Sequence, residues 1–163
     1  RTPQEALANA RRLMECGAAA VKLEGGVAHL PEVKAIIEAG IPFVGHIGML
    51  PQSVKEEGGY KKKGKTADQI TALLADAQAL DEAGACAMVL ESIVPEVATQ
   101  ITAAVQATTI GIGAGTATDG QVLVTPDLLG SYPWFRPPFA KARADVASET
   151  LRAVREYVNE VRG

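Results

Sequence analysis

The chain has 163 residues, of which 47 % are hydrophobic and 21 % charged, and its formal net charge is −3. These values are typical of an ordinary globular protein with one substantial core, and the negative charge argues against a nucleic-acid or anionic-membrane partner. No signal-peptide pattern and no apolar run of about 18 residues occurs, so no membrane span is expected. Two cysteines are too few for a disulfide framework, which indicates a reduced, cytoplasmic protein.

Helical and strand-like segments alternate along the chain. Thr2-Pro3-Gln4-Glu5 is a capping box with proline at the first helical position, so a helix is expected from the start. Further helices are expected over residues 31–39, 66–83 and 95–106, and a charged amphipathic helix over 138–162. Strands are expected over residues 18–23, 42–47, 86–90 and 108–112, with a weaker candidate over 121–124.

Short apolar strands that alternate with helices predict an α/β fold with a parallel sheet. Polar residues stand at the carboxyl ends of consecutive strands, which is the active-site pattern of a (β/α)₈ barrel. Such a barrel typically needs about 250 residues, whereas only four or five βα units fit here. We therefore expect residues 1–163 to be the C-terminal portion of a single TIM-barrel domain, with residues 138–162 as its C-terminal helix.

Lys22 and Glu24 end the first expected strand, in the stretch AAAVKLEGG. Residues two apart in a strand share a face, so the two charges should lie side by side. They can form a structural ion pair, which is the better interpretation of an arbitrary buried pair. They can also bind ligands, the lysine an anionic substrate and the glutamate a hard cation such as Mg²⁺. Gly25 and Gly26 favour this second interpretation, because they let a ligand approach the backbone closely.

His46 and Glu91 stand at the ends of the next two expected strands, in VGHIG and CAMVLES. A neutral imidazole between glycines can donate to or accept from a substrate oxygen, although a lone histidine is more often a satisfied core residue. Burial disfavours the charged form of the Glu91 carboxylate, which suits a general base near neutral pH. Its alternative role is a hydrogen bond to the next helix, for which Ser92 is the better cap. His29, in VAHL, has no such glycine neighbours at a strand end, and we expect it to have a structural role.

Composition and spacing alone lead to a barrel-type enzyme with metal-assisted chemistry on a small anionic substrate. Five motifs, however, resemble those of the ketopantoate hydroxymethyltransferase (3-methyl-2-oxobutanoate hydroxymethyltransferase) family. They are VKLEGG, GHIGMLPQSV, GGYKKKGK, VLESIVPE and IGIGAGTATDGQVLV, in this order. The resemblance covers nearly the whole chain and weakens after about Leu129. Five ordered motifs are far more specific than any single one.

The resemblance implies a Mg²⁺-dependent (β/α)₈ barrel of the phosphoenolpyruvate/pyruvate superfamily that acts in pantothenate biosynthesis. The family moves a hydroxymethyl group from 5,10-methylenetetrahydrofolate to 3-methyl-2-oxobutanoate and forms 2-dehydropantoate. By motif match, Lys22 and His46 would bind the keto acid, and Glu91 would remove its C3 proton. Glu24 would belong to the metal site, directly or through water. The resemblance also implies a cytoplasmic homo-oligomer whose partners are small molecules.

Departures from the family pattern qualify this implication. Two aspartates that bind the metal directly in the family, one of them followed by a substrate-binding serine, have no match here. Five aspartates lie in other contexts and are not expected to replace them: Asp68, Asp76, Asp81, Asp119 and Asp127. Leu50 stands where the family usually has threonine, and residues 131–139, SYPWFRPPF, depart from the usual sequence. We therefore expect residues 1–163 alone to be inactive and to bind Mg²⁺ poorly.

Two alternatives stay open. The first is another 2-oxo-acid carbon–carbon lyase or mutase of the same superfamily. A cysteine in a loop at the barrel mouth would favour a lyase, but Cys16 and Cys86 stand at the starts of expected strands. The second is a non-catalytic partial barrel that acts as an assembly module. It should self-associate, because a partial barrel exposes unpaired strand edges.

Overall fold

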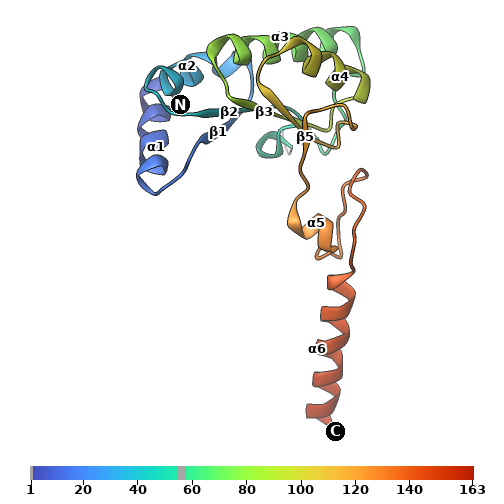
Figure 1. Cartoon of the computed structure of the whole chain (residues 1–163). Coiled ribbons are helices and arrows are strands. Elements are labelled where there is room, and N and C mark those ends of the chain that lie inside the picture. Colours follow the sequence, from blue (N-terminus) through green and yellow to red (C-terminus); the bar gives the residue numbers. More distant parts are fainter. Residues whose placement is uncertain (1, 55–57) are drawn as a thin grey trace. The chain divides into compact units, whose positions relative to one another are not determined.

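The structure is a computed structural model that describes residues 2–54 and 58–163 (Figure 1). Residues 1–121 form one compact unit and residues 122–163 form a second. The first unit holds the sheet and the four residues singled out above for chemistry. Part of the glycine- and lysine-rich loop expected before residue 66, namely residues 55–57, lies outside the described residues.

The first unit alternates strands and helices in the predicted order. Its strands are β1 (Val21–Glu24), β2 (Phe43–Gly48), β3 (Ala87–Glu91), β4 (Thr108–Ile112) and the short β5 (Gly120–Gln121). Its α-helices are α1 (Pro3–Glu15), α2 (Leu30–Glu38), α3 (Ala67–Ala83) and α4 (Pro95–Ala104). Two short 3₁₀ helices, η1 (Val27–His29) and η2 (Pro51–Ser53), follow β1 and β2.

The five strands form one parallel sheet in the order β1-β2-β3-β4-β5. Each strand thus pairs with the next strand of the chain, and helices α2, α3 and α4 lie along the same side of the sheet (Figure 1). A doubly wound sheet would reverse its strand order at a switch point and carry helices on both faces. Sequential order is instead that of an arc of a (β/α)₈ barrel. The predicted fold class is therefore confirmed.

Side chains and a glycine define the ends of helices α1 and α3, and the capping box predicted at Thr2 is present. The Thr2 hydroxyl accepts a hydrogen bond from the Glu5 N–H, while the Glu5 carboxylate accepts one from the Thr2 N–H, which completes the capping box of α1. The Thr66 hydroxyl caps α3 by accepting from the Gln69 N–H. Gly84 ends α3 with a φ of 98°, a left-handed conformation that favours glycine.

The first and last strands are shorter than predicted. β1 begins at Val21 rather than at residue 18, because the Ala18 N–H donates to the Leu13 carbonyl and so belongs to the end of α1. The weak candidate over 121–124 is reduced to β5, whose two residues pair with β4. In both segments the apolar stretch of the sequence is longer than the part of the backbone that pairs in the sheet.

Helix α4 differs from the prediction at both ends. It stops at Ala104 rather than at residue 106, because Val105 is extended with φ −115° and ψ 157°. Its N-cap is Val94, which makes no side-chain hydrogen bond, so the prediction that Ser92 caps this helix is wrong. Ser92 is instead buried with a φ of 51°, and no other non-glycine residue among those described has a positive φ.

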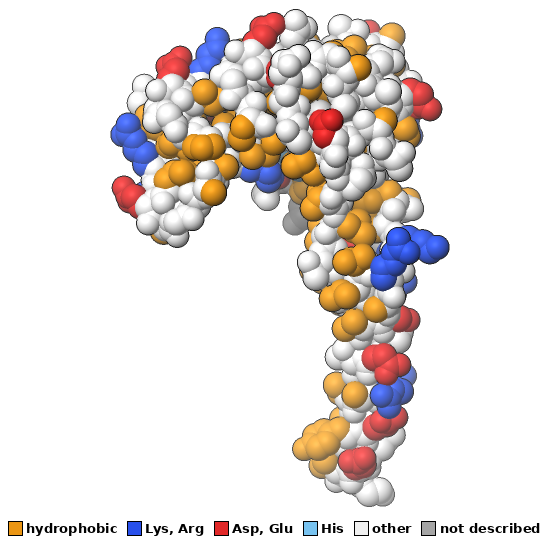
Figure 2. Space-filling view, in the orientation of Figure 1, with side chains coloured by type: hydrophobic (Ala, Val, Ile, Leu, Met, Phe, Trp, Pro, Cys, Tyr) orange, Lys and Arg blue, Asp and Glu red, His pale blue; other side chains and the backbone are white. Residues whose placement is uncertain are grey.

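The two faces of the sheet differ in burial. Side chains that face the helices, such as Phe43, Met88 and Leu90, are fully buried and form the hydrophobic core. The opposite face carries Val89 and Ile110, which are paired between β3 and β4 and are only half-buried. Figure 2 shows hydrophobic side chains gathered on this side of the first unit. In a closed barrel this face would line the interior.

The second unit contains α5 (Thr125–Leu129) and α6 (Val146–Arg162). The predicted helix over 138–162 is therefore wrong over residues 138–145. The Arg143 N–H donates to the Leu128 carbonyl of α5, so it is not available for a helical hydrogen bond. Asp145 then caps α6 by accepting from the Ser148 N–H. An N-cap residue is non-helical, so the helix begins after it.

Helix α6 is strongly amphipathic. On its polar side Arg152 bridges Glu149 and Glu156, at i−3 and i+4 spacing. Several of its apolar side chains are exposed, among them Leu151, Val154, Val158 and Val161. Figure 2 shows hydrophobic side chains at the surface of this helix. Even so, none of the helices in the described ranges is both long and apolar enough to cross a membrane.

Aspartates of α3 tie neighbouring loops to the helix layer. Asp76 Oδ1 accepts from the Val27 N–H at 2.8 Å and so holds the start of η1. Asp81 Oδ1 accepts from the Gln106 and Ala107 N–H groups at 2.9 and 2.7 Å and so holds the turn into β4. Both carboxylates satisfy backbone donors that would otherwise lack a partner. Asp76 and Asp81 thus have structural roles in the helix layer.

Asp119 holds β4 in a similar way. Its carboxylate accepts hydrogen bonds of 2.8 Å from both the N–H and the hydroxyl of Thr109, which is fully buried. The Thr109 hydroxyl also lies 3.0 Å from that of Thr102 in α4. The hydrogen bond from the Thr109 N–H, followed by that from its hydroxyl, lowers the pKa of Asp119 below the ordinary value of 3.8.

We expect Asp119→Asn to destabilise the protein at neutral pH, and the difference from wild type to shrink in acid. A carboxylate whose pKa is lower in the folded state stabilises that state above pH 3.8, and the contribution is lost as the pH falls through the folded pKa. Thermal unfolding midpoints of the two proteins, measured from neutral pH down to about pH 3, check this. Glu160→Gln, on exposed α6, is the control and should show little effect at any pH. A difference that widens in acid would contradict the expectation.

Candidate active site

Side chains from the carboxyl ends of β1, β2 and β3 meet on the face of the sheet that helices α2, α3 and α4 leave uncovered. Parallel pairing sets Glu24 opposite His46, and Gly48 opposite Glu91. Because alternate residues of a strand share a face, Lys22 lies on the same side as Glu24. The structure thus brings together the four residues singled out from the sequence, and we call them the site cluster: Lys22, Glu24, His46 and Glu91.

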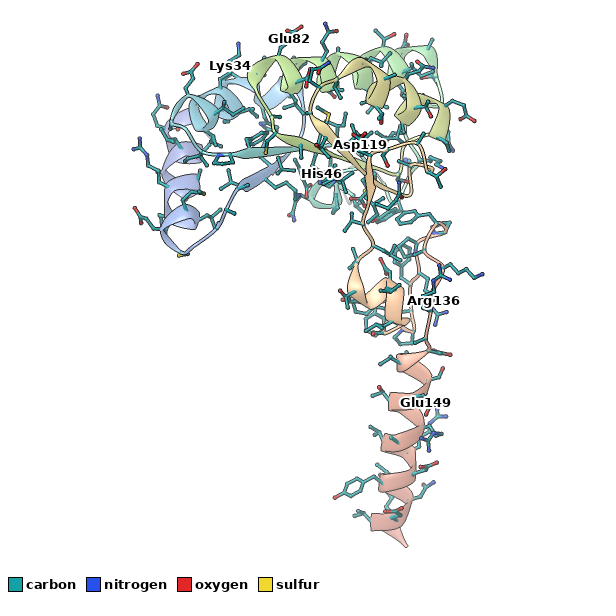
Figure 3. All side chains as sticks on the ribbon, in the orientation of Figure 1. Lys34, His46, Glu82, Asp119, Arg136 and Glu149 are labelled. Carbon is teal, nitrogen blue, oxygen red and sulfur yellow. The ribbon has the colours of Figure 1, made fainter. Side chains whose placement is uncertain are left out.

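His46 is the central member of the site cluster and is only 4 % exposed; Figure 3 shows it beside the sheet. Its Nδ1 is 3.1 Å from Lys22 Nζ and 3.9 Å from Glu24 Oε1, and its Nε2 is 3.1 Å from Glu91 Oε2. A charged lysine can only donate, so Nδ1 must be the acceptor of this hydrogen bond. The ring proton therefore lies on Nε2, and His46 is neutral.

The His46 Nε2–H group is the least satisfied part of the site cluster. It is buried and makes no aligned hydrogen bond within the described residues, since the Glu91 oxygen lies close to it but out of line. A buried donor without a partner costs about 1–3 kcal/mol. The group is therefore available to donate to an oxygen atom of a ligand that enters beside Glu91.

Glu91 is held by a residue that sequence reasoning missed. The residue is 5 % exposed, and its Oε1 accepts a hydrogen bond of 2.8 Å from the Tyr60 hydroxyl. Tyr60 belongs to the motif GGYKKKGK, but a single aromatic residue in a polar loop has no periodicity that indicates its direction. The available signal was the glycine pair before it, Gly58 and Gly59, which marks a tight turn.

Glu24 presents a carboxylate at the edge of the site cluster. Its Oε1 is 3.7 Å from Lys22 Nζ, and its Oε2 accepts from the Gln52 N–H of η2 at 3.2 Å. Within residues 2–54 and 58–163, no group of three or more His, Cys, Asp or Glu side chains is placed to hold a metal ion. The described residues therefore fit at most a part of a divalent-cation site.

Other side chains with chemical potential lie elsewhere. Cys16 caps the end of α1 and Cys86 directly precedes β3, so both lie toward the amino ends of the strands, as predicted. His29 forms the N-cap of α2 and is outside the site cluster. Asp76 and Asp81 bind backbone groups of the helix layer. None of these side chains is among the contacts of the four clustered residues.

The arrangement suits removal of a proton from a small anion. Lys22 is 45 % exposed along its side chain and offers a positive charge to an incoming carboxylate. His46 offers a neutral N–H donor, and Glu91 offers a buried carboxylate next to it. A positioned carboxylate within reach of a bound substrate is a usual general base, and nearby donors can stabilise the charge that develops.

Comparison with known proteins identifies relatives along the whole chain. A sequence model of the family described as ketopantoate hydroxymethyltransferase matches residues 1–163. Curated proteins named 3-methyl-2-oxobutanoate hydroxymethyltransferase are similar to it. That of Thermoanaerobacter sp. (strain X514) is 50 % identical over 97 % of this chain and 58 % of its own length. That of Dehalococcoides mccartyi (strain ATCC BAA-2266 / KCTC 15142 / 195) is 52 % identical over 98 % of this chain and 57 % of its own length.

Among solved structures, a putative phosphonomutase from Burkholderia cenocepacia J2315 has a similar fold, with a TM-score of 0.52 and 15 % sequence identity. The match covers 99 % of this chain and 66 % of that chain. At this level of identity it shows a similar fold and nothing about function. The chain spans less than two thirds of the length of the curated relatives it matches. With a family model that matches from the first residue to the last, the chain belongs to the ketopantoate hydroxymethyltransferase family.

Proposed function

We propose that the protein transfers a hydroxymethyl group from 5,10-methylenetetrahydrofolate to 3-methyl-2-oxobutanoate and forms 2-dehydropantoate, in pantothenate biosynthesis. Relatives about half identical to this chain carry the corresponding name, which supports the choice of reaction. The observation that carries the proposal is the buried Glu91 carboxylate beside the free N–H of His46. A cytoplasmic location and a homo-oligomeric state are also proposed, and they rest on the family resemblance alone.

In the proposed reaction, the site cluster binds the keto acid and removes one proton. Lys22 pairs with the negative charge of the substrate, and the His46 Nε2–H donates to one of its oxygen atoms. Glu91 takes the proton from C3, and the electron pair of the C–H bond moves toward the keto oxygen. The lysine and the imidazole N–H stabilise this charge. Water adds to the methylene carbon of the folate as its two C–N bonds break, and the two protons of the water pass to the folate nitrogens of the released tetrahydrofolate. C3 attacks the resulting formaldehyde-level carbon, and the new alkoxide takes back the proton held by Glu91 to give the hydroxymethyl group.

The proposal includes Mg²⁺, with Glu24 as one ligand, directly or through water. When bound, the ion would stabilise negative charge on the substrate oxygens. The described residues fit this role only in part, because Glu24 supplies a single carboxylate that already lies near the Lys22 ammonium group. Mg²⁺ prefers several oxygen ligands. The remaining ligands would have to come from outside the described residues.

Glu91→Gln in the full-length gene product is the main test. The amide cannot accept the C3 proton, so the rate of transfer, and of deuterium exchange at C3 of 3-methyl-2-oxobutanoate in D₂O, should fall by about 10²–10⁴-fold. Glu96→Gln, on the exposed first turn of α4, is the matched control and should keep the wild-type rate. Exchange that survives in Glu91→Gln at the wild-type rate would exclude Glu91 as the base.

Lys22→Met tests the contact with the anionic substrate. Loss of a charge-assisted hydrogen bond is worth about 1.5–3 kcal/mol, so kcat/KM for the keto acid should fall by about 10–100-fold. Lys34→Met is the control, because Lys34 is exposed on α2, away from the site cluster (Figure 3). Steady-state kinetics with the keto acid as the varied substrate check this. Equal kcat/KM values for the two variants would contradict the assignment of Lys22.

Residues 1–163 by themselves should bind Mg²⁺ weakly. One carboxylate beside a lysine is a poor site for a cation that prefers several oxygen ligands, so a Kd on the order of 1 mM or weaker is expected. Calorimetric titration of this polypeptide with MgCl₂ measures the affinity, and deuterium exchange at C3 measures its activity, which should be absent. Micromolar binding, or exchange by this polypeptide alone, would show that these residues suffice.

A further inference from the structure

The Tyr60–Glu91 hydrogen bond joins a loop to the residue proposed as the general base. The hydroxyl of Tyr60 donates to Glu91 Oε1 at 2.8 Å, and His46 Nε2 lies 3.1 Å from the other oxygen, Oε2. The carboxylate is therefore flanked on both oxygens. Neither Tyr60 nor this hydrogen bond was among the contacts expected from the sequence.

Backbone geometry on both sides of Tyr60 fixes its position. Before it, Gly58 and Gly59 have φ values of 73° and 113°, and the Gly59 N–H donates to the Val54 carbonyl at 2.8 Å. Left-handed φ values of this kind favour glycine. The chain thus turns sharply just before the tyrosine.

After Tyr60 the chain joins the segment that follows β3. The Lys63 N–H donates to the Ser92 carbonyl at 2.8 Å, and the Val94 N–H donates to the Lys63 carbonyl at 2.9 Å. These two bonds form a parallel bridge between Lys63 and Ile93. Ser92, the residue with a φ of 51°, directly follows Glu91, so the loop is attached to the backbone next to the carboxylate that Tyr60 contacts.

We propose that Tyr60 is a positioning residue for Glu91, an inference that rests on the proposed function. A glutamate side chain has several rotatable bonds, and a base that is misplaced by about 1 Å can lose about 10² in rate. By holding Oε1, Tyr60 fixes the plane of the carboxylate and leaves Oε2 as the atom that accepts the C3 proton. The phenol also donates to the ionised carboxylate, which is the form a base needs.

Tyr60→Phe in the full-length gene product tests the inference, because it removes only the hydroxyl. We expect kcat for deuterium exchange at C3 to fall by about 10–100-fold, with little change in KM for the keto acid. A fall in kcat without a rise in KM separates loss of positioning from loss of substrate binding. The other described groups around Glu91 are His46 and, behind it, Lys22 and Glu24.

Tyr157→Phe is the matched control, because Tyr157 is 67 % exposed on α6. It should leave kcat and KM unchanged. Unfolding midpoints of both variants show whether either one fails to fold. A Tyr60→Phe enzyme with the kcat of wild type would overturn the inference.

A second readout does not depend on activity. The full-length protein labelled with 3-fluorotyrosine should give a ¹⁹F resonance for each of Tyr60, Tyr132 and Tyr157, assigned by Tyr→Phe substitution. Glu91→Gln should shift the Tyr60 resonance and leave those of Tyr132 and Tyr157 in place. An unmoved Tyr60 resonance would overturn the inference even in an inactive protein. Absence of exchange in the wild type would instead refute the proposed function, and the fluorine shift would still decide whether the contact exists.

Discussion

The register of β1, β2 and β3 is the constraint on which the site cluster depends. Parallel pairing sets Glu24 level with His46, and Glu91 level with Gly48, two residues further along β2. His46 therefore lies directly beside Glu24 of β1, and it contacts Glu91 of β3 at a position two residues further along the sheet. A shift of the pairing by one residue would turn each of these side chains to the opposite face of the sheet. The contacts of the imidazole with both glutamates exist only in this register.

The hydrophobic layer behind the sheet maintains that register. Phe43 and Ile47 of β2 alternate with His46 and are fully buried on the helix side. Gly45 lets Leu80 of α3 approach the same strand, because a side chain at Gly45 would collide with it. A slip of β2 would expose these apolar groups to water, at a cost of about 1.5–3 kcal/mol for each large side chain. Core packing on one face thus stabilises a polar arrangement on the other.

Much of the fold and part of the site follow from the sequence because they are local. Each strand is a short apolar run, and helices α1 and α3 carry side-chain caps in their own sequence, Thr2 and Thr66. Lys22, Glu24, His46 and Glu91 could be singled out because each one interrupts or ends an apolar run, and parallel strands bring such ends together.

The parts that could not be predicted depend on contacts between distant residues. Tyr60 and Glu91 are 31 residues apart, and their hydrogen bond depends on the geometry of two glycine residues and a backbone bridge. Residues 138–145 have favourable local composition for a helix, yet the Arg143 N–H is used by α5. The conformation of Ser92 likewise follows from the Lys63 and Ile112 backbone groups bonded to it, which no local pattern reveals.

The loop that carries Tyr60 differs in one respect from most surface connections. Such connections usually accept insertions and deletions, because few contacts fix their length. Here the Tyr60 hydroxyl binds Glu91 at the end of β3, and the Lys63 N–H binds the carbonyl of the next residue, Ser92. These two contacts together fix the length of chain between Tyr60 and Lys63. In evolutionary terms, the number of residues between Tyr60 and Lys63 should be more strongly constrained than the identity of the exposed Lys62.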